Sequence, residues 1–385
     1  MDEDSRRRLK LLFIANVGIA ICINMIMSLQ SLYLADLGAS VSDIGYVFSL
    51  TSAISTAFMF IFGLISDLID PGTVISMCFF LLVISGIFLG YVRTWREAIP
   101  FLVLSSSAFA IFIPIRMLMI ANMSKERKMG ITYGVMNLSW PIGGLIGPIL
   151  GGILAERWGW KALYSSEAIT ALFFMVPSLM LRKGENMRRK IRSFSLKMFR
   201  VTRDVIIFLL AYGILSTSRG MLDPILPIYL DEEFSLTKSQ IGFFSSIGLG
   251  LATMITQVPS GMLGDRIGYK KAMVLFTLPI PLILFIWPHV DNVALLGILY
   301  MTLIGTWSAT WPSSISYIVR ISSKDIRSVV ITLRQTSIRV GFIIGPSLAG
   351  ILWSHYDASL VFYGMAVISL IALLFMLILG DERRR

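Results

Sequence analysis

Residues 182–203 read RKGENMRRKIRSFSLKMFRVTR, a basic segment that separates two long apolar regions. Nine of these 22 residues are Lys or Arg, and Glu185 is the single acid. Hydrophobic residues make up 56% of the 385-residue chain, charged residues make up 15%, and the mean hydropathy is +0.78. This composition is typical of a protein whose solvent is lipid rather than water. The basic segment therefore joins two membrane-embedded regions.

The two apolar regions each divide into six runs at charged residues and at Gly, Pro and Asp turns. Each run is about long enough to cross a hydrocarbon core as a helix, which takes roughly 20 residues. We therefore expect an all-α membrane protein with twelve transmembrane helices. The predicted spans cover residues 11–35, 43–66, 73–92, 98–122, 131–155, 160–181, 204–230, 239–263, 272–288, 293–320, 329–353 and 358–380.

The distribution of basic residues predicts how these helices are oriented. With the N-terminus in the cytoplasm, 25 of the 34 Lys and Arg residues fall in cytoplasmic segments and 5 fall in outer loops. Because cytoplasmic loops carry an excess of positive charge, we expect a multi-pass protein of the cell membrane with both termini in the cytoplasm. The net charge of +11 then reflects topology and contact with anionic lipid rather than binding to nucleic acid.

The two apolar regions also resemble each other as an internal repeat. Because each copy has six spans, both copies enter the membrane from the same side, and a cavity is expected between them. This predicts two pseudo-symmetric six-helix halves, residues 1–181 and 204–385, with residues 182–203 as a basic cytoplasmic linker. Gly63 matches Gly261, Asp67 matches Asp265, Pro114 matches Pro312 and Gly147-Pro148 matches Gly345-Pro346 at an offset of 198, whereas Ile44-Gly45 matches Ile241-Gly242 at 197.

The loop after the eighth span reads GMLGDRIGYKK over residues 261–271. It resembles the G-x-L-x-D-R-x-G-R-K loop of the major facilitator superfamily, through Gly261, Asp265, Arg266, Gly268 and Lys271. The resemblance covers the whole chain and implies a transporter fold in which two halves rock about a central site.

The first-half copy of this loop keeps Gly63 and Asp67 but has no basic residue. In the family, the loop lies near the cytoplasmic end of the eleventh helix. The resemblance therefore implies Arg334 as the partner of Asp67 in a cytoplasmic gate.

The fifth span carries glycines at regular spacing: Gly143, Gly147-Pro148 and Gly151-Gly152. Small residues four apart allow helices to approach closely, and a proline bends a span. The pattern resembles the G-x-x-x-G-P-x-x-G-G sequence of the family's drug and proton antiporters, although such glycines also serve general helix packing. The eleventh span repeats it less completely, as Gly341, Gly345-Pro346 and Gly350, with Ala349 in the doubled-glycine position.

Six charged residues fall inside predicted spans and more than two residues from either end. Each costs roughly 2.5 to 3.5 kcal/mol at a helix centre, so they should face protein or water. Tyr212, Ser216, Arg219 and Asp223 form one stripe on the seventh span. Arg219 and Asp223 are predicted either to form a structural ion pair or to serve in the substrate path, with Asp223 as proton carrier. The six residues are Arg116, Glu167, Arg219, Asp223, Arg334 and Arg339.

The other spans offer fewer candidates for the substrate or proton path. Arg116 and Arg339 either contact substrate or form interhelical hydrogen bonds, and Arg339 shares a stripe with Gln335. Thr310 belongs to a neutral polar stripe on the tenth span. Asn24 is the polar candidate of the first span, which lacks the acid that many related antiporters have there. Glu167, near the outer end of a helix that is usually peripheral in the family, is expected to face the surface or to be structural.

These features predict a secondary transporter with alternating access that exports a small organic compound in exchange for protons. An organic-anion carrier is the alternative, since four intramembrane arginines exceed two acids. No Walker loop, nucleophile pattern or metal-ligand spacing is present, so neither an enzyme nor a cofactor is expected. The expected partners are a small-molecule substrate, a proton and the lipid bilayer, and the protein is expected to be a monomer.

Overall fold

The computed structural model describes residues 3–65, 69–123, 135–181, 202–322 and 326–381. These residues form helices and no strand, and eleven helical segments among them are long and apolar enough to cross a membrane. All twelve predicted spans lie on these segments, because the longest, Val135–Leu179, contains both the fifth and the sixth. The predicted all-α class is therefore confirmed.

The chain forms two compact units. Unit 1 comprises Met1–Ala39, Leu50–Arg192 and Ser235–Ser246, whereas unit 2 comprises Ser40–Ser49, Ser193–Phe234 and Ile247–Arg385. Two short segments, 40–49 and 235–246, which begin the second and the eighth span, group with the other unit, and the bounds of the predicted halves stay a prediction. Most of the predicted linker, residues 182–201, lies outside the described part of the chain, so its role stays a prediction.

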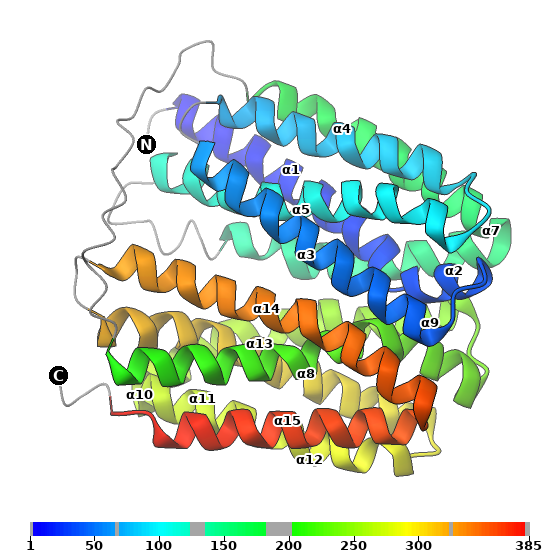
Figure 1. Ribbon diagram of the computed structural model, residues 1–385. Helices are drawn as coiled ribbons and strands as arrows, with labels where there is room; N and C mark the ends of the chain where they lie inside the picture. Colours follow the sequence, from blue (N-terminus) through cyan, green and yellow to red (C-terminus); the bar gives the residue numbers. More distant parts are fainter. Residues whose placement is uncertain (1–2, 66–68, 124–134, 182–201, 323–325, 382–385) are drawn as a thin grey trace. The chain divides into compact units, whose positions relative to one another are not determined.

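Unit 1 is organised around a long helix, α7, which contacts α1, α4 and α9 (Figure 1). The start of α4 has a clear local cause, since the Asp70 carboxylate accepts a hydrogen bond from the Thr73 backbone nitrogen at 2.8 Å and Pro71 occupies the first turn. The helices are α1 (Glu3–Met27), α2 (Gln30–Asp36), the greater part of α3 (Val41–Ile65), α4 (Pro71–Leu89), α5 (Trp95–Met123), α7 (Ser139–Leu179) and α9 (Lys238–Ser246).

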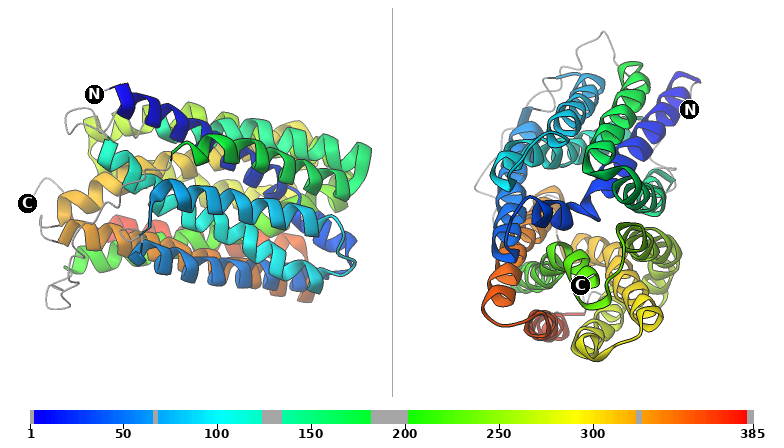
Figure 2. Two further views of the ribbon diagram at one scale, coloured as in Figure 1. Left: turned by 90° about the horizontal axis from the view of Figure 1, so that it is seen from above. Right: turned by 90° about the vertical axis from the view of Figure 1, so that its right-hand side faces the viewer.

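Unit 2 is organised around α8, which packs against α14 and α15 (Figures 1 and 2). Asp357 caps α15 by accepting a hydrogen bond from the Leu360 nitrogen at 2.8 Å. The helices are α8 (Arg203–Phe234), η3 (Ile247–Ala252), α10 (Thr253–Ile267), α11 (Tyr269–Thr277), α12 (Pro279–Ile286), η4 (Trp287–His289), α13 (Val293–Ile321), α14 (Arg327–His355) and α15 (Ala358–Ile378).

Two local features interrupt the regular helices. Gly159 has a φ of 79° inside α7, a conformation that favours glycine, and the chain turns there from the fifth span into the sixth. The segment η3 is a π-helix, and Gly248 within it lies so close to Tyr300 that a Cβ atom would be 2.3 Å from the ring. The Thr253 hydroxyl donates to the Gly248 carbonyl oxygen at 3.2 Å, so a side chain supplies a donor in the widened turn.

The surface distribution of side chains is that of a protein in lipid. Large apolar residues such as Phe173, Leu282 and Ile298 are exposed, whereas Arg334 and Glu167 are buried. A protein in water would bury most of its large apolar side chains and expose most of its charged ones. The apolar outer face and polar interior agree with a multi-pass membrane protein.

Candidate functional site

An aromatic cage surrounds a buried arginine in unit 2. Arg334 of α14 is 1% exposed, and its guanidinium lies 4.4 Å from the ring centroid of Trp311 and 5.4 Å from that of Tyr212. Its Nη2 donates to the Ser314 hydroxyl at 2.7 Å, and its Nη1 donates to Gln335 Oε1 at 3.3 Å. No carboxylate among the described residues forms an ion pair with it. In the part of the chain that the structure describes, this positive charge is contacted by ring faces and hydrogen-bond acceptors.

A second charged layer lies further along α8. Arg219 and Asp223 form the ion pair that their spacing allows, and both side chains are largely buried. The Arg219 guanidinium also lies 5.8 Å from the ring centroid of Trp307, four residues before Trp311 on α13. The two tryptophans therefore place one aromatic ring beside each arginine, about one helical turn apart.

Unit 1 contains a similar arrangement. Arg116 of α5 donates from Nη1 to Asn16 Oδ1 at 3.1 Å and from Nη2 to Asn137 Oδ1 at 3.4 Å. Asn16 is held in turn by the Met136 carbonyl oxygen, which its Nδ2 reaches at 2.8 Å, and by the Ser139 hydroxyl. Arg116 is thus fixed by amide oxygens.

The two arginine sites correspond through the repeat, because the amide residues Asn137 and Gln335 are 198 positions apart. Each amide accepts a hydrogen bond from a guanidinium. In unit 1 the fourth span supplies the arginine, at a position that Ser314 occupies in the second repeat. In unit 2 the eleventh span supplies it instead, and Ser314 becomes an acceptor. In both units an arginine thus donates to an amide at the same repeat position, although the arginine comes from a different helix.

The remaining predicted path residues have less prominent positions. Asn24 is fully buried on α1, where its Nδ2 donates to the Ala20 carbonyl oxygen at 2.8 Å and its Oδ1 has no hydrogen-bond partner in the described residues. The Thr310 carbonyl oxygen accepts from the Tyr212 hydroxyl at 3.2 Å. Ser216 is buried where α8 meets Gly341. Arg339 is only half-buried, and its substrate role stays a prediction.

The antiporter-type glycines have a packing role that the geometry makes explicit. A Cβ atom on Gly143, Gly147 or Gly151 would come within 2.2 to 2.8 Å of backbone atoms of α1. Gly152 faces another way, and its Cβ would lie 2.6 Å from the Lys238 carbonyl oxygen at the start of α9. Gly143, Gly147 and Gly151 therefore allow α7 to pack closely against α1, and Gly152 allows it to pack closely against α9.

Pro148 and its repeat partner take part in matching contacts. A Cβ on Gly242 of α9 would lie 2.1 Å from the Pro148 carbonyl oxygen in unit 1, and one on Gly45 of α3 would lie 2.4 Å from the Pro346 carbonyl oxygen in unit 2. Gly345 approaches the backbone of α8 in the same way that Gly147 approaches α1. The repeat is thus present in the helix contacts as well as in the sequence.

The proposed gate loops are seen only in part, since Asp67 lies outside the described residues. Asp265 accepts a hydrogen bond from the Tyr269 hydroxyl at 2.6 Å, and Gly268 provides the turn into α11 with a φ of 99°. The other members of the motif, Gly63, Gly261, Arg266 and Lys271, lie at or near the surface. The expected partnership of Asp67 with Arg334 stays a hypothesis, and the contacts that are visible tie Arg334 to Tyr212 and Trp311.

Glu167 differs from its expected surface position. It is 0% exposed, packed where α7 meets α1 and α4, so the surface-facing alternative is wrong. The expectation depended on the peripheral place of this helix in the family, and the structural alternative is the one that burial leaves. The nearby Lys161 ammonium lies over the Tyr91 ring at 4.3 Å. The helical spacing to Tyr164, which is also buried, is the signal that would have found this position.

Sequence reasoning also missed the partners that other helices supply. Trp307 and Trp311 were overlooked because the tenth span was searched for hydroxyl groups, although two tryptophans four apart in a polar stripe are a usable signal for cation binding. Asn16 was overlooked because Asn24 lies deeper in the first span. No cluster of His, Cys, Asp or Glu suited to a metal ion occurs in the described residues.

Known proteins provide an independent comparison. The chain is 23% identical over 375 residues to an uncharacterised MFS-type transporter, YuxJ, of Bacillus subtilis (strain 168), covering 91% of this chain and 93% of that protein. It is 28% identical over 269 residues to the multidrug resistance protein MdtG of Proteus mirabilis (strain HI4320), covering 67% of this chain and 66% of MdtG. The match thus spans about two thirds of this multidrug resistance relative.

Solved structures show the same fold. The nucleoside transporter NupG superimposes with a TM-score of 0.82 at 13% identity, covering 97% of this chain and 100% of that one. A bacterial homologue of the human lysosomal transporter Spinster, in an inward-facing and unoccupied conformation, gives 0.79 at 12% identity, covering 100% and 98%. A profile of the Major Facilitator Superfamily matches residues 12–207 and again residues 208–385. With both repeats matched and the helices arranged as described, the chain belongs to the Major Facilitator Superfamily and is a transporter rather than an enzyme.

Proposed function

We propose that this transporter exports a small organic compound in exchange for protons, by alternating access of two six-helix halves. The observation that carries the proposal is the Arg219–Asp223 pair, a carboxylate and a guanidinium on one face of a membrane-spanning helix. Relatives named as multidrug resistance proteins and the antiporter-type glycine pattern of α7 support the direction of transport.

The ion pair suggests how a proton and a substrate compete. While Asp223 is ionised, it balances the charge of Arg219 in a largely buried place. A proton on the carboxylate removes that balance and leaves the guanidinium to the Trp307 ring. Substrate binding and proton binding are then linked through Arg219, because each changes the charge that the other meets.

Replacing Asp223 with asparagine is expected to abolish transport driven by a pH gradient, since the amide cannot take up a proton. Binding of substrate without a gradient should lose the pH dependence that this carboxylate contributes, because the amide stays neutral at every pH. Flux into sealed proteoliposomes with an imposed pH gradient measures the first, and equilibrium binding measures the second. Asp231→Asn, at an exposed position of the same helix, is the matched control. Unchanged coupling in Asp223→Asn would rule out this carboxylate as the proton carrier.

A second candidate function, transport of an organic anion, is favoured by the cage around Arg334. A buried guanidinium without a carboxylate partner in the described residues is suited to a substrate carboxylate or phosphate, which can accept two parallel hydrogen bonds. Flux of matched cationic, neutral and anionic compounds, each with and without a pH gradient, separates the two functions. Stimulation by a gradient with cationic substrates supports the first, and competition by small anions supports the second.

The orientation and assembly follow the sequence argument. We propose that both termini face the cytoplasm, because the excess of basic residues lies in the segments that this orientation places inside. We also propose a monomeric protein whose linker rests on anionic lipid. Labelling of single cysteines placed in the loops by an impermeant reagent tests the orientation.

A further inference from the structure

Glu167 is a buried acid of unit 1 that forms no ion pair among the described residues. Its side chain is fully buried, and neither carboxyl oxygen has a hydrogen-bond partner among the described residues. The hydroxyl of Tyr164, one turn earlier on α7, is also buried and has no hydrogen-bond partner in the described part of the chain. Burying an ionised carboxylate with no partner costs several kcal/mol more than burying the neutral acid. The surroundings of Glu167 therefore suit a carboxyl group that holds a proton.

Within the described part of the chain, no cation forms an ion pair with Glu167, and the groups packed around its part of α7 are neutral. From α1 comes Cys22, whose thiol lies 3.9 Å from the Glu167 carbonyl oxygen. From α4 comes Gly86, whose Cβ would lie 2.6 Å from the Tyr164 carbonyl oxygen, and the one ionisable residue within α4 is Cys78. From α7 comes Tyr164, which contacts Tyr33 of α2. Thiol and phenol groups are neutral near pH 7, so a proton is the natural charge-neutralising ligand.

A column of aromatic rings leads from Glu167 toward the surface. The Tyr164 and Tyr33 ring centroids are 4.6 Å apart, and those of Tyr33 and Trp160 are 5.4 Å apart. Tyr33 is fixed further by its hydroxyl, which donates to the Leu89 carbonyl oxygen. Trp160 precedes Glu167 by seven residues, or about 10 Å along a helix. The three rings are thus in contact with one another beside the stretch of α7 between Trp160 and Glu167.

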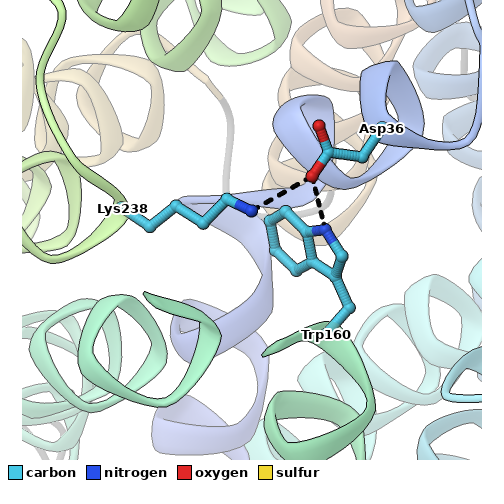
Figure 3. A network of polar contacts seen from close by, with 3 residues as sticks. All are labelled: Asp36, Trp160 and Lys238. Carbon is cyan, nitrogen blue, oxygen red and sulfur yellow. Dashed lines mark hydrogen bonds and ion pairs between the residues drawn. The ribbon is translucent and has the colours of Figure 1, made fainter. Parts of the chain in front are cut away.

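A polar latch secures the outer end of this column. Figure 3 shows Lys238 and Trp160 reaching the same carboxylate oxygen of Asp36. The Lys238 Nζ lies 3.0 Å from Asp36 Oδ2, the Trp160 Nε1 donates to it at 2.7 Å, and the Lys238 ammonium lies 4.2 Å from the Trp160 ring centroid. The Lys238 and Asp36 side chains are 32% and 51% exposed, so water can replace each partner.

We propose that Glu167 is a proton-binding site closed by the Asp36–Trp160–Lys238 latch, with the Trp160–Tyr33–Tyr164 column as its plug. Lys238 begins α9, so a movement of α9 away from α7 breaks the latch and frees Trp160. Water then reaches Glu167, and the carboxyl group exchanges its proton with that water: a carboxylate takes H⁺ from hydronium, or the acid returns it. A role of this site in coupling rests on the proposed function, the exchange of substrate for protons. Binding of a proton to Glu167 does not depend on that proposal.

Infrared spectroscopy of the purified protein in an ester-free detergent tests the site directly, through the C=O stretch of a protonated carboxyl group, which an ionised carboxylate lacks. Wild type should show this band near neutral pH, and Glu167→Gln, which keeps the size of the side chain, should lack it. On transfer to D2O the band should shift slowly in wild type. In Lys238→Gln the shift should be at least about tenfold faster, because the latch loses an ion pair and a cation–π contact.

Lys161→Gln is the matched control, since that lysine lies beside Trp160 in the chain but over Tyr91, and it should exchange at the wild-type rate. A band unaffected by Glu167→Gln overturns the proposal, and so does an exchange rate unaffected by Lys238→Gln, which would make Glu167 a structural acid. Wild-type protein that shows the gated exchange but no pH-driven flux would refute the proposed antiport and leave the binding site standing.

Discussion

In the Arg334→Lys variant, the rate of transport is expected to be about ten- to hundredfold lower than in wild type, while the protein remains folded. The planar guanidinium of Arg334 lies over Trp311 and Tyr212 and donates from separate nitrogens to Ser314 and Gln335. A lysine keeps the charge but presents one ammonium group, which cannot stack and span both acceptors together. Loss of one hydrogen bond to a charged group costs about 1.5 to 3 kcal/mol, which matches the expected decrease.

The measurement is substrate flux per folded transporter in proteoliposomes, with the folded fraction taken from gel filtration. Arg320→Lys is the matched control, because Arg320 also lies over an aromatic ring, that of Tyr269 at 4.7 Å, but is exposed to solvent. A lysine can keep that contact, so flux should stay near wild type. Full flux in Arg334→Lys would mean that a point charge suffices and that the cage does not select for guanidinium geometry.

Gly147→Leu is expected to prevent stable folding. A Cβ atom at Gly147 would lie 2.8 Å from both the Ile21 carbonyl oxygen and the Met25 nitrogen, and these are backbone atoms of α1 that no side-chain rotation can move. The two helices must separate, which loses packing along their whole contact. Overpacking typically costs about 1 to 3 kcal/mol, and a leucine placed against backbone belongs at or above the upper end.

Thermal unfolding of the purified protein measures this effect. Gly63→Ala is the control for the loss of a glycine, because nothing lies within 4 Å of the Cβ position there, and its midpoint should stay close to wild type. Gly345→Leu should repeat the effect in unit 2, where the nearest atom is the Thr217 carbonyl oxygen at 2.4 Å. A wild-type midpoint for Gly147→Leu would show that α1 and α7 are not held at this distance.

Sequence periodicity predicted those structural features that depend on a single helix. Apolar runs gave the twelve spans, and the spacing of Arg219 and Asp223 gave their ion pair, because residues four apart in a helix must be neighbours. The division of α7 at Gly159 was also expected from the turn residues between the fifth and sixth spans. Each of these features is determined by residues close to one another in the sequence.

Contacts between helices could not be predicted in the same way. Arg334 was expected in the cytoplasmic gate because it lies near the cytoplasmic end of the eleventh span, and that expectation stays a hypothesis. A position along one helix does not say which side chains of other helices it meets. The cage of Arg334 depends on Trp311 from a second helix and Tyr212 from a third. Glu167 was misplaced for the same reason, since its burial depends on how closely α1 and α4 approach α7.

The π-helical segment η3 explains a small irregularity in the repeat. The offset between the two copies is 197 at Gly45 and Gly242 but 198 at Gly63 and Gly261, so the second copy has one additional residue between these points. The segment Ile247–Ala252 lies inside that interval. An extra residue would turn the rest of an α-helix by about 100°, whereas a widened turn absorbs it and leaves the following residues on their original face. The segment is thus the mark of a one-residue insertion or deletion after gene duplication, tolerated because the loop motif at Gly261 kept its direction.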